Sequence, residues 1–187
     1  MRTHLILGLL LTVAQAFAAG GEVQYKLLAT SKTSTMEREM NQAADAGYVF
    51  SGVMGGETAL GGNEVVVVMW KPKGADGVSG KRYKLLATSK TSTMQKEMQA
   101  AADEGFAYLG QTVFVSAFGG REVGVIMERN VDEAPKARKY LLLATSKTGT
   151  MNKELNDAGG EGYQLRGVTV AKTAFGGSEL VCILEKQ

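Results

Sequence analysis

Residues 27–36 read LLATSKTSTM, and the same ten residues recur at 85–94 and, with one change, at 142–151 (LLATSKTGTM). Each copy opens a stretch that closes on a Gly-Gly pair, a glutamate (GGxE) and a short apolar run. A fixed period of this kind indicates a repeat architecture. We assign the repeats to residues 22–71, 83–129 and 140–187. Residues 72–82 and 130–139 are rich in charge, Gly or Pro and are predicted linkers.

Each copy predicts a strand, a helix and two further strands. In the first copy, Ser34 and Glu37 fit a helix capping box, and Gly47 stands where a helix prefers a left-handed C′ residue. The apolar residues between them repeat with helical spacing and form a narrow stripe; they are Met36, Met40, Ala43 and Ala44. Glycines at matching positions of the following strand (Gly52, Gly110 and Gly167) predict a bend or bulge, and the Gly-Gly pairs predict hairpin turns.

The fold class that follows is α+β, with three tandem β-α-β-β repeats. We expect the third strand of each repeat to lie antiparallel between the first two. One repeat alone buries too little surface for wide stability. The three are therefore expected to pack as one pseudo-threefold body of about nine strands and three helices, with independent repeats on flexible linkers as the alternative.

A family resemblance extends over all three repeats. The YKLL start, the helix end LNDAGGEGYQL (residues 155–165) or AADAGYVF (residues 43–50), and the apolar hairpin resemble a widespread bacterial family of small β-α-β-β domains of unknown function. That family has an E-Y-K start and a helix end of the form N-x-x-G-x-E-G-W/Y. The third repeat matches this helix end, whereas the other two keep only its glycine and aromatic residue. The resemblance implies a fold, and it brings no activity, cofactor or catalytic residue.

The first eighteen residues have the pattern of a secretory signal peptide. Arg2 supplies a positive charge, residues 5–14 are a short apolar run, and Ala16-Phe17-Ala18 matches a cleavage site after Ala18. The apolar run is too short to span a bilayer. We therefore expect an exported protein, periplasmic or extracellular, without a transmembrane segment; an ordinary N-terminal helix is the alternative.

Composition argues against several classes of function. The formal net charge is +2, and about +1 without Arg2, so nothing electrostatic favours a nucleic-acid partner. The only histidine, His4, belongs to the predicted signal peptide, so the exported chain is expected to lack Ser-His and Cys-His pairs. Cys182, the single cysteine, is expected to be a buried small hydrophobe, with a reactive thiol or an intermolecular disulfide as the alternative. We predict no cofactor, metal site or catalytic residue; copper binding by the helix methionines is a weaker alternative.

The loop before each helix is the candidate ligand-binding site, because T-S-K-T-x-T-M is unchanged in all three copies. A helix N-terminus favours anions, and a lysine there is unfavourable by about 0.3–1 kcal/mol, so a lysine kept in all three copies suggests an anionic partner. Alternatively, Ser and Thr cap the helix while Lys reaches an acidic side chain of the protein itself. The candidate residues are Ser31, Lys32, Thr33, Ser89, Lys90, Thr91, Ser146, Lys147 and Thr148.

A second set of polar residues occurs at the edge of the apolar helix stripe: Glu39, Glu97 and Glu154. A carboxylate in that position needs a partner, and the loop lysines or a strand tyrosine are the candidates. A structural ion pair is one interpretation, and an active-site acid is the other.

Three functions remain open. The first is a non-enzymatic binding or scaffolding module, whose Ser/Thr/Lys loops recognise an anionic or polyhydroxylated ligand or a protein partner. The second is a structural, self-associating envelope protein that pairs edge strands of neighbouring chains. The third is an enzyme that uses the helix-edge glutamates with the loop lysines.

Overall fold

The computed structural model describes residues 21–58, 62–115, 121–172 and 178–187. Within these residues, each repeat forms one helix and one three-stranded antiparallel sheet, so the α+β class and the β-α-β-β order are confirmed. The predicted signal peptide and most of the Gly-Gly turns lie outside the described residues.

The elements of the three repeats have closely matching lengths. The first repeat comprises β1 (Val23–Thr30), α1 (Thr33–Asp45), β2 (Val49–Thr58) and β3 (Gly62–Pro72). The second comprises β4 (Lys81–Thr88), α2 (Thr91–Asp103), β5 (Ala107–Val115) and β6 (Arg121–Asn130). The third comprises β7 (Lys139–Thr145), α3 (Thr148–Gly160), β8 (Gln164–Lys172) and β9 (Ser178–Lys186).

The last strand of each repeat is the central strand of its sheet, as predicted. The strand orders are β1-β3-β2, β4-β6-β5 and β7-β9-β8, and each central strand is antiparallel to both neighbours. The first two strands are therefore parallel, and the helix between them is the crossover that parallel strands require. The pairing shifts at the predicted bulges, between Phe50 and Gly52, Tyr108 and Gly110, and Leu165 and Gly167.

The helices bury the predicted stripe against the sheets. Met36, Met40, Ala43 and Ala44 are buried in α1, and their counterparts Met94, Met98, Ala101 and Ala102 are buried in α2. In α3 only Met151 and Ala158 are buried. The predicted C′ glycines Gly47, Gly105 and Gly162 have φ values of 87°, 94° and 91°, where a side chain would be strained.

A basic residue from the central strand closes the C-terminus of each helix. The Nζ atom of Lys71 donates a hydrogen bond to the carbonyl oxygen of Ala46 at 3.1 Å and lies 4.9 Å from the ring centre of Tyr48. Arg129 and Lys186 occupy the equivalent positions and bond in the same way. A cation suits the negative end of a helix, which explains why this position is basic in all three copies.

The predicted capping box is wrong. Lys32 is the N-cap residue of α1, and no side chain caps the helix. The carboxylate of Glu37 instead accepts a hydrogen bond at 3.0 Å from the backbone N–H of Leu85, in the next repeat. Gln95 of α2 does the same for Leu142 of the third repeat. The side chains that suggested a cap therefore join one repeat to the next.

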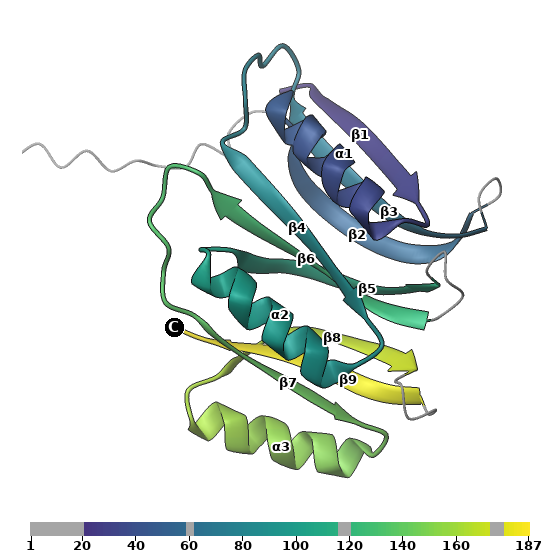
Figure 1. Cartoon of the computed structure of the whole chain (residues 1–187), viewed down its shortest axis with the longest axis vertical. Helices are drawn as coiled ribbons and strands as arrows, with labels where there is room; N and C mark the ends of the chain where they lie inside the picture. Colours follow the sequence, from purple (N-terminus) through teal and green to yellow (C-terminus); the bar gives the residue numbers. More distant parts are fainter. Residues whose placement is uncertain (1–20, 59–61, 116–120, 173–177) are drawn as a thin grey trace, which may run out of the picture.

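The three repeats pack into one body as a row, with the second repeat between the other two (Figure 1). Helix α1 packs between its own sheet and β4, and α2 packs in the same way against β7. One apolar core contains α1 together with Tyr83, Leu85 and Phe114 of the second repeat. The next core contains α2 together with Tyr140 and Leu142 of the third repeat. Each following repeat therefore completes the core of the one before it.

Candidate functional site

The three Ser/Thr/Lys loops lie on the same side of the molecule, one in each repeat, where β1, β4 and β7 lead into their helices (Figure 1). The backbone conformation is nearly the same in each, with φ of −113°, −110° and −110° at Lys32, Lys90 and Lys147. A threonine two residues earlier accepts a hydrogen bond from the lysine N–H at 3.1 to 3.2 Å in every copy. The retained threonine therefore has a structural role in shaping the loop.

The lysine side chains, in contrast, are exposed in all three loops. Among the described residues, no ion pair or hydrogen bond involves the amino group of Lys32, Lys90 or Lys147. The expected internal pairing with a carboxylate is therefore not found. These lysines differ from Lys71 and its counterparts, whose contacts explain their charge.

The burial of the loop serine and threonine residues depends on the repeat to which they belong. Ser89 and Thr91 are half-buried, and the loop of the second repeat lies beside Leu142 and Val181 of the third. Ser146 and Thr148, in the last repeat, are exposed. The cavity beside the second loop measures only about 10 Å³, so any ligand there would bind on the surface.

The helix-edge glutamates do not join the loops. Glu39 and Glu154 are half-buried and Glu97 is exposed. In the part of the chain that the structure describes, none of the three forms an ion pair with a loop lysine. The structure therefore does not assemble the Glu-Lys arrangement that an enzyme of the third hypothesis would need.

The interfaces between repeats contain polar residues that sequence reasoning missed. At the first interface, Asn41 of α1 accepts a hydrogen bond from the N–H of Tyr83 and donates one to its carbonyl oxygen, both at 3.0 Å. At the second, Gln99 of α2 accepts from the N–H of Tyr140 at 3.1 Å and donates to the carbonyl oxygen of Arg138 at 2.9 Å. Helix side chains thus form hydrogen bonds with backbone groups of the edge strand in the next sheet. Without them, this strand would expose unpaired backbone groups.

The signal for these residues was present in the sequence. Each helix has a polar pair at positions i and i+4: Glu37 with Asn41, Gln95 with Gln99, and Asn152 with Asn156. Residues four apart share one face of a helix, and amide or carboxylate side chains there can pair with a strand edge. This pattern could have indicated that each helix contacts a strand outside its own repeat.

Each interface also contains a hydrogen bond to the hydroxyl of a tyrosine from the following repeat. The hydroxyl of Tyr83 accepts a hydrogen bond from the N–H of Phe50 at 3.0 Å, and that of Tyr140 accepts one from Tyr108 at 2.8 Å. Both backbone donors lie at the bulge of the preceding repeat. Burial raises the pKa of Tyr83 and Tyr140 well above the ordinary value, and it raises the pKa of Tyr108 to about 12.

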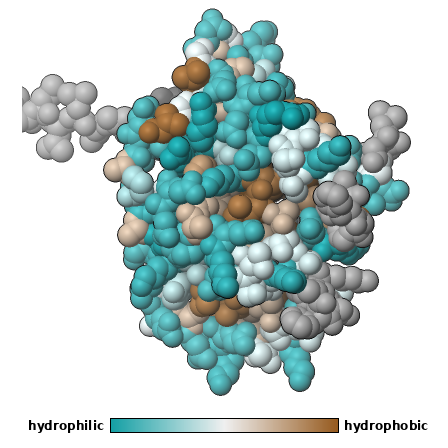
Figure 2. All heavy atoms as spheres, viewed as in Figure 1, coloured by the Kyte–Doolittle hydropathy of each residue, from teal (hydrophilic) through white to brown (hydrophobic). Residues whose placement is uncertain are grey.

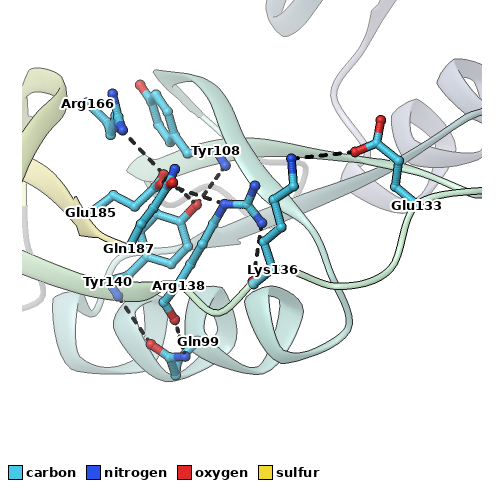
Figure 3. Close-up of polar contacts among 9 residues, drawn as sticks. All are labelled: Gln99, Tyr108, Glu133, Lys136, Arg138, Tyr140, Arg166, Glu185 and Gln187. Atoms are coloured by element: carbon cyan, nitrogen blue, oxygen red, sulfur yellow. Dashed lines mark hydrogen bonds and ion pairs between the residues drawn. The ribbon is translucent and has the colours of Figure 1, made fainter. Parts of the chain in front are cut away.

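A buried carboxylate, that of Glu185, lies next to Tyr140 (Figure 3). Glu185 is 4% exposed and accepts a hydrogen bond from the Tyr140 hydroxyl at 3.1 Å. The Nε atoms of Arg138 and Arg166 each lie 3.5 Å from its oxygens. Its charge is therefore compensated on both sides, as burial of a carboxylate requires. Glu128 has the equivalent position in the second repeat, where Lys81 Nζ donates to it at 2.7 Å.

A surface cavity of about 670 Å³ lies next to this cluster. The linker before β7 and the end of α2 form its walls, with charged side chains of both signs that include Asp103, Lys136 and Lys139. This volume is in the range of small-molecule sites. The two linker sequences differ, however, so this cavity is not part of the repeated design.

Comparison of the chain with protein-family models, with curated proteins and with solved structures found no match. The resemblance to a β-α-β-β family therefore stays a prediction from the motifs.

No helix of the described residues is long and apolar enough to cross a membrane. Cys182 is buried in β9, and burial raises the pKa of its thiol, which disfavours the reactive thiolate.

Proposed function

We propose that the protein is an exported, non-enzymatic scaffolding module that binds an anionic polymer through its row of three Ser/Thr/Lys loops. The observation that carries the proposal is the exposed N-cap lysine, which occurs in the same conformation in all three repeats and on one side of the body. The export component depends on residues 1–18, which lie outside the described residues.

The row favours a repetitive ligand over a small one. A single lysine at a helix end binds an anion weakly in water, because exposed charge pairs contribute at most about 1 kcal/mol. Three equivalent loops held at fixed positions can bind one polymer together, and simultaneous binding multiplies the separate affinities. The interfaces that join the repeats supply the fixed positions.

A test can compare two variants with the same loss of charge. The loop variant replaces Lys32, Lys90 and Lys147 with Gln. The control variant replaces Arg38, Lys96 and Lys153 with Gln, which are exposed basic residues at equivalent positions of the three helices. Binding of heparin, a sulfated polysaccharide, is measured by titration calorimetry at several salt concentrations.

We expect the loop variant to lose about tenfold or more in heparin affinity and the control about twofold, because only the loop lysines stand at a helix N-terminus. Equal losses would attribute binding to net charge alone and refute the loop site. Undetectable binding of heparin by the unaltered protein at low salt would also count against the proposal.

A second candidate, a self-assembling structural protein, is favoured by a different observation: apolar side chains are exposed at both ends of the row.

A further inference from the structure

The exposed apolar residues of the protein are concentrated at the two ends of the row. Of the nine large hydrophobic side chains exposed among the described residues, seven lie on end surfaces, and only Val78 and Val131 lie elsewhere, in the linkers. The face seen in Figure 2 is mostly hydrophilic, with only small apolar patches. Most of the exposed large apolar side chains therefore lie at the two ends, which we name the head and the tail.

The head is the open face of β1 and β2 in the first repeat, with the exposed side chains Val23, Tyr25, Leu27 and Met54. Tyr25 and Leu27 correspond to Tyr83 and Leu85 of β4, which the preceding helix covers. Tyr25 and Leu27 are 63% and 67% exposed, whereas Tyr83 and Leu85 are 2% and 7% exposed. The head thus carries the same docking residues as the internal interfaces, and no repeat covers them within the described residues.

Glycines at the bulge of each second strand show the same difference. A Cβ atom added to Gly110 would lie 3.2 Å from Val53 of the preceding repeat, and one added to Gly167 would lie 2.1 Å from the hydroxyl oxygen of Tyr108. At Gly52, the equivalent position of the first repeat, nothing lies within 4 Å. The space into which a preceding repeat would pack is therefore open at the head.

The tail is the outer face of α3 and β8. Asn152 and Asn156 are exposed there, at the positions where Glu37 and Asn41 hold β4 and where Gln95 and Gln99 hold β7. Leu165, Val168 and Val170 of β8 are exposed too, at the positions of Phe50, Val53 and Gly55 in β2. The tail thus carries the other half of the internal interface.

We propose that the tail of one chain docks onto the head of a second copy, with α3 and β8 of the first chain against β1 and β2 of the next. In this contact Asn156 pairs with the backbone of Tyr25, Asn152 accepts from the N–H of Leu27, and the N–H of Leu165 donates to the hydroxyl of Tyr25. Each pairing repeats a hydrogen bond made inside the chain.

A second copy is the occupant that these surfaces fit, because both halves of an interface already built twice within the chain remain open at its ends. Repeat proteins that stay monomeric have terminal repeats with a polar outer face, and these ends lack one. The contact joins two different surfaces, so it continues into a filament or closes into a ring. It differs from edge-strand pairing, because helix side chains cover the strand edge.

Sedimentation velocity of the purified protein over a concentration series tests this inference. The head variant is Leu27→Arg and the tail variant is Val168→Arg; both positions are exposed, so the fold of a single chain tolerates the charge. Val78→Arg, at an exposed linker position, is the matched control. Circular dichroism confirms folding, and Leu27→Ser replaces the head variant if the arginine disturbs it.

We expect the unaltered protein and the control to sediment faster as concentration rises, and each end variant to remain a monomer. An equimolar mixture of the two end variants should form a species of two chains and nothing larger, because only one intact head and one intact tail can meet. A monomeric unaltered protein at every concentration would overturn the inference and leave the ends to a different partner. End variants that assemble normally, or a mixture that stays monomeric, would overturn it as well.

The inference does not depend on the polymer-binding proposal. The loop lysines lie outside the head and the tail, so the variant that replaces Lys32, Lys90 and Lys147 should assemble as the unaltered protein does. Either proposal can therefore fail while the other stands.

Discussion

The same six residues, YKLLAT, occupy two strands of this molecule in opposite surroundings. In β4 (residues 83–88) the first and third residues, Tyr83 and Leu85, are buried beneath α1. In β1 (residues 25–30) the equivalent Tyr25 and Leu27 are exposed. The two strands pair with their own central strands in the same way, so pairing does not cause the difference. The surroundings of a strand are set by the helix of the preceding repeat, and the described residues contain no such helix before β1.

The largest effect should come from removing a tyrosine ring. Tyr83→Ala should lower the free energy of unfolding by about 3–5 kcal/mol, because it empties a core shared by two repeats. Tyr25→Ala should change it by no more than about 0.5 kcal/mol in the monomer, because the ring is largely in solvent. Urea denaturation at low protein concentration measures both. Similar losses for the two variants would mean that the first repeat is also covered in solution.

A smaller effect on stability should come from the hydroxyl group of the buried tyrosine, Tyr83. A raised pKa in the folded state favours the neutral phenol, so this contribution to stability is fully present below pH 10 and is lost as pH rises towards the folded-state pKa. Each such tyrosine contributes a slope of about 1.4 kcal/mol per pH unit in that window.

Tyr83→Phe should therefore make the decline of stability above pH 10 shallower by about that slope. At neutral pH it should cost about 0.5–1.5 kcal/mol, because the hydrogen bond from Phe50 is lost. Tyr140→Phe at the second interface is the companion variant, and urea denaturation from pH 8 to 11 gives both values. An unchanged slope in both variants would show that these hydroxyls are not buried at the interfaces.

The sequence predicted what one repeat determines by itself. The spacing of Met36 and Met40, the C′ glycine Gly47 and the bulge at Gly52 are local patterns, and the structure confirms each of them. Glu37 was misassigned because a cap and a contact to another repeat use the same side chain at the same helical position. The contact of its carboxylate with Leu85 depends on how two repeats pack, which a pattern within one repeat does not show.

For the candidate site too, the sequence predicted the features that lie within one repeat and missed those that join two repeats. The loops were located correctly before their helices, but their lysines proved to be free of internal ion pairs within the described residues. Sequence could not decide this, because a lysine side chain is long enough to reach several carboxylates. The interface pairs such as Asn41 with Tyr83 were missed because they join residues of different repeats.

Amide hydrogen exchange at Leu27 and Leu85, followed by NMR on the monomeric protein, tests most directly whether the helix of one repeat covers the first strand of the next repeat. Both amides follow a lysine in the same hexapeptide, so their intrinsic exchange rates are matched. The N–H of Leu85 is bonded to Glu37, and we predict that it exchanges at least about a hundredfold more slowly than that of Leu27. Equal exchange rates for the two amides would contradict the account.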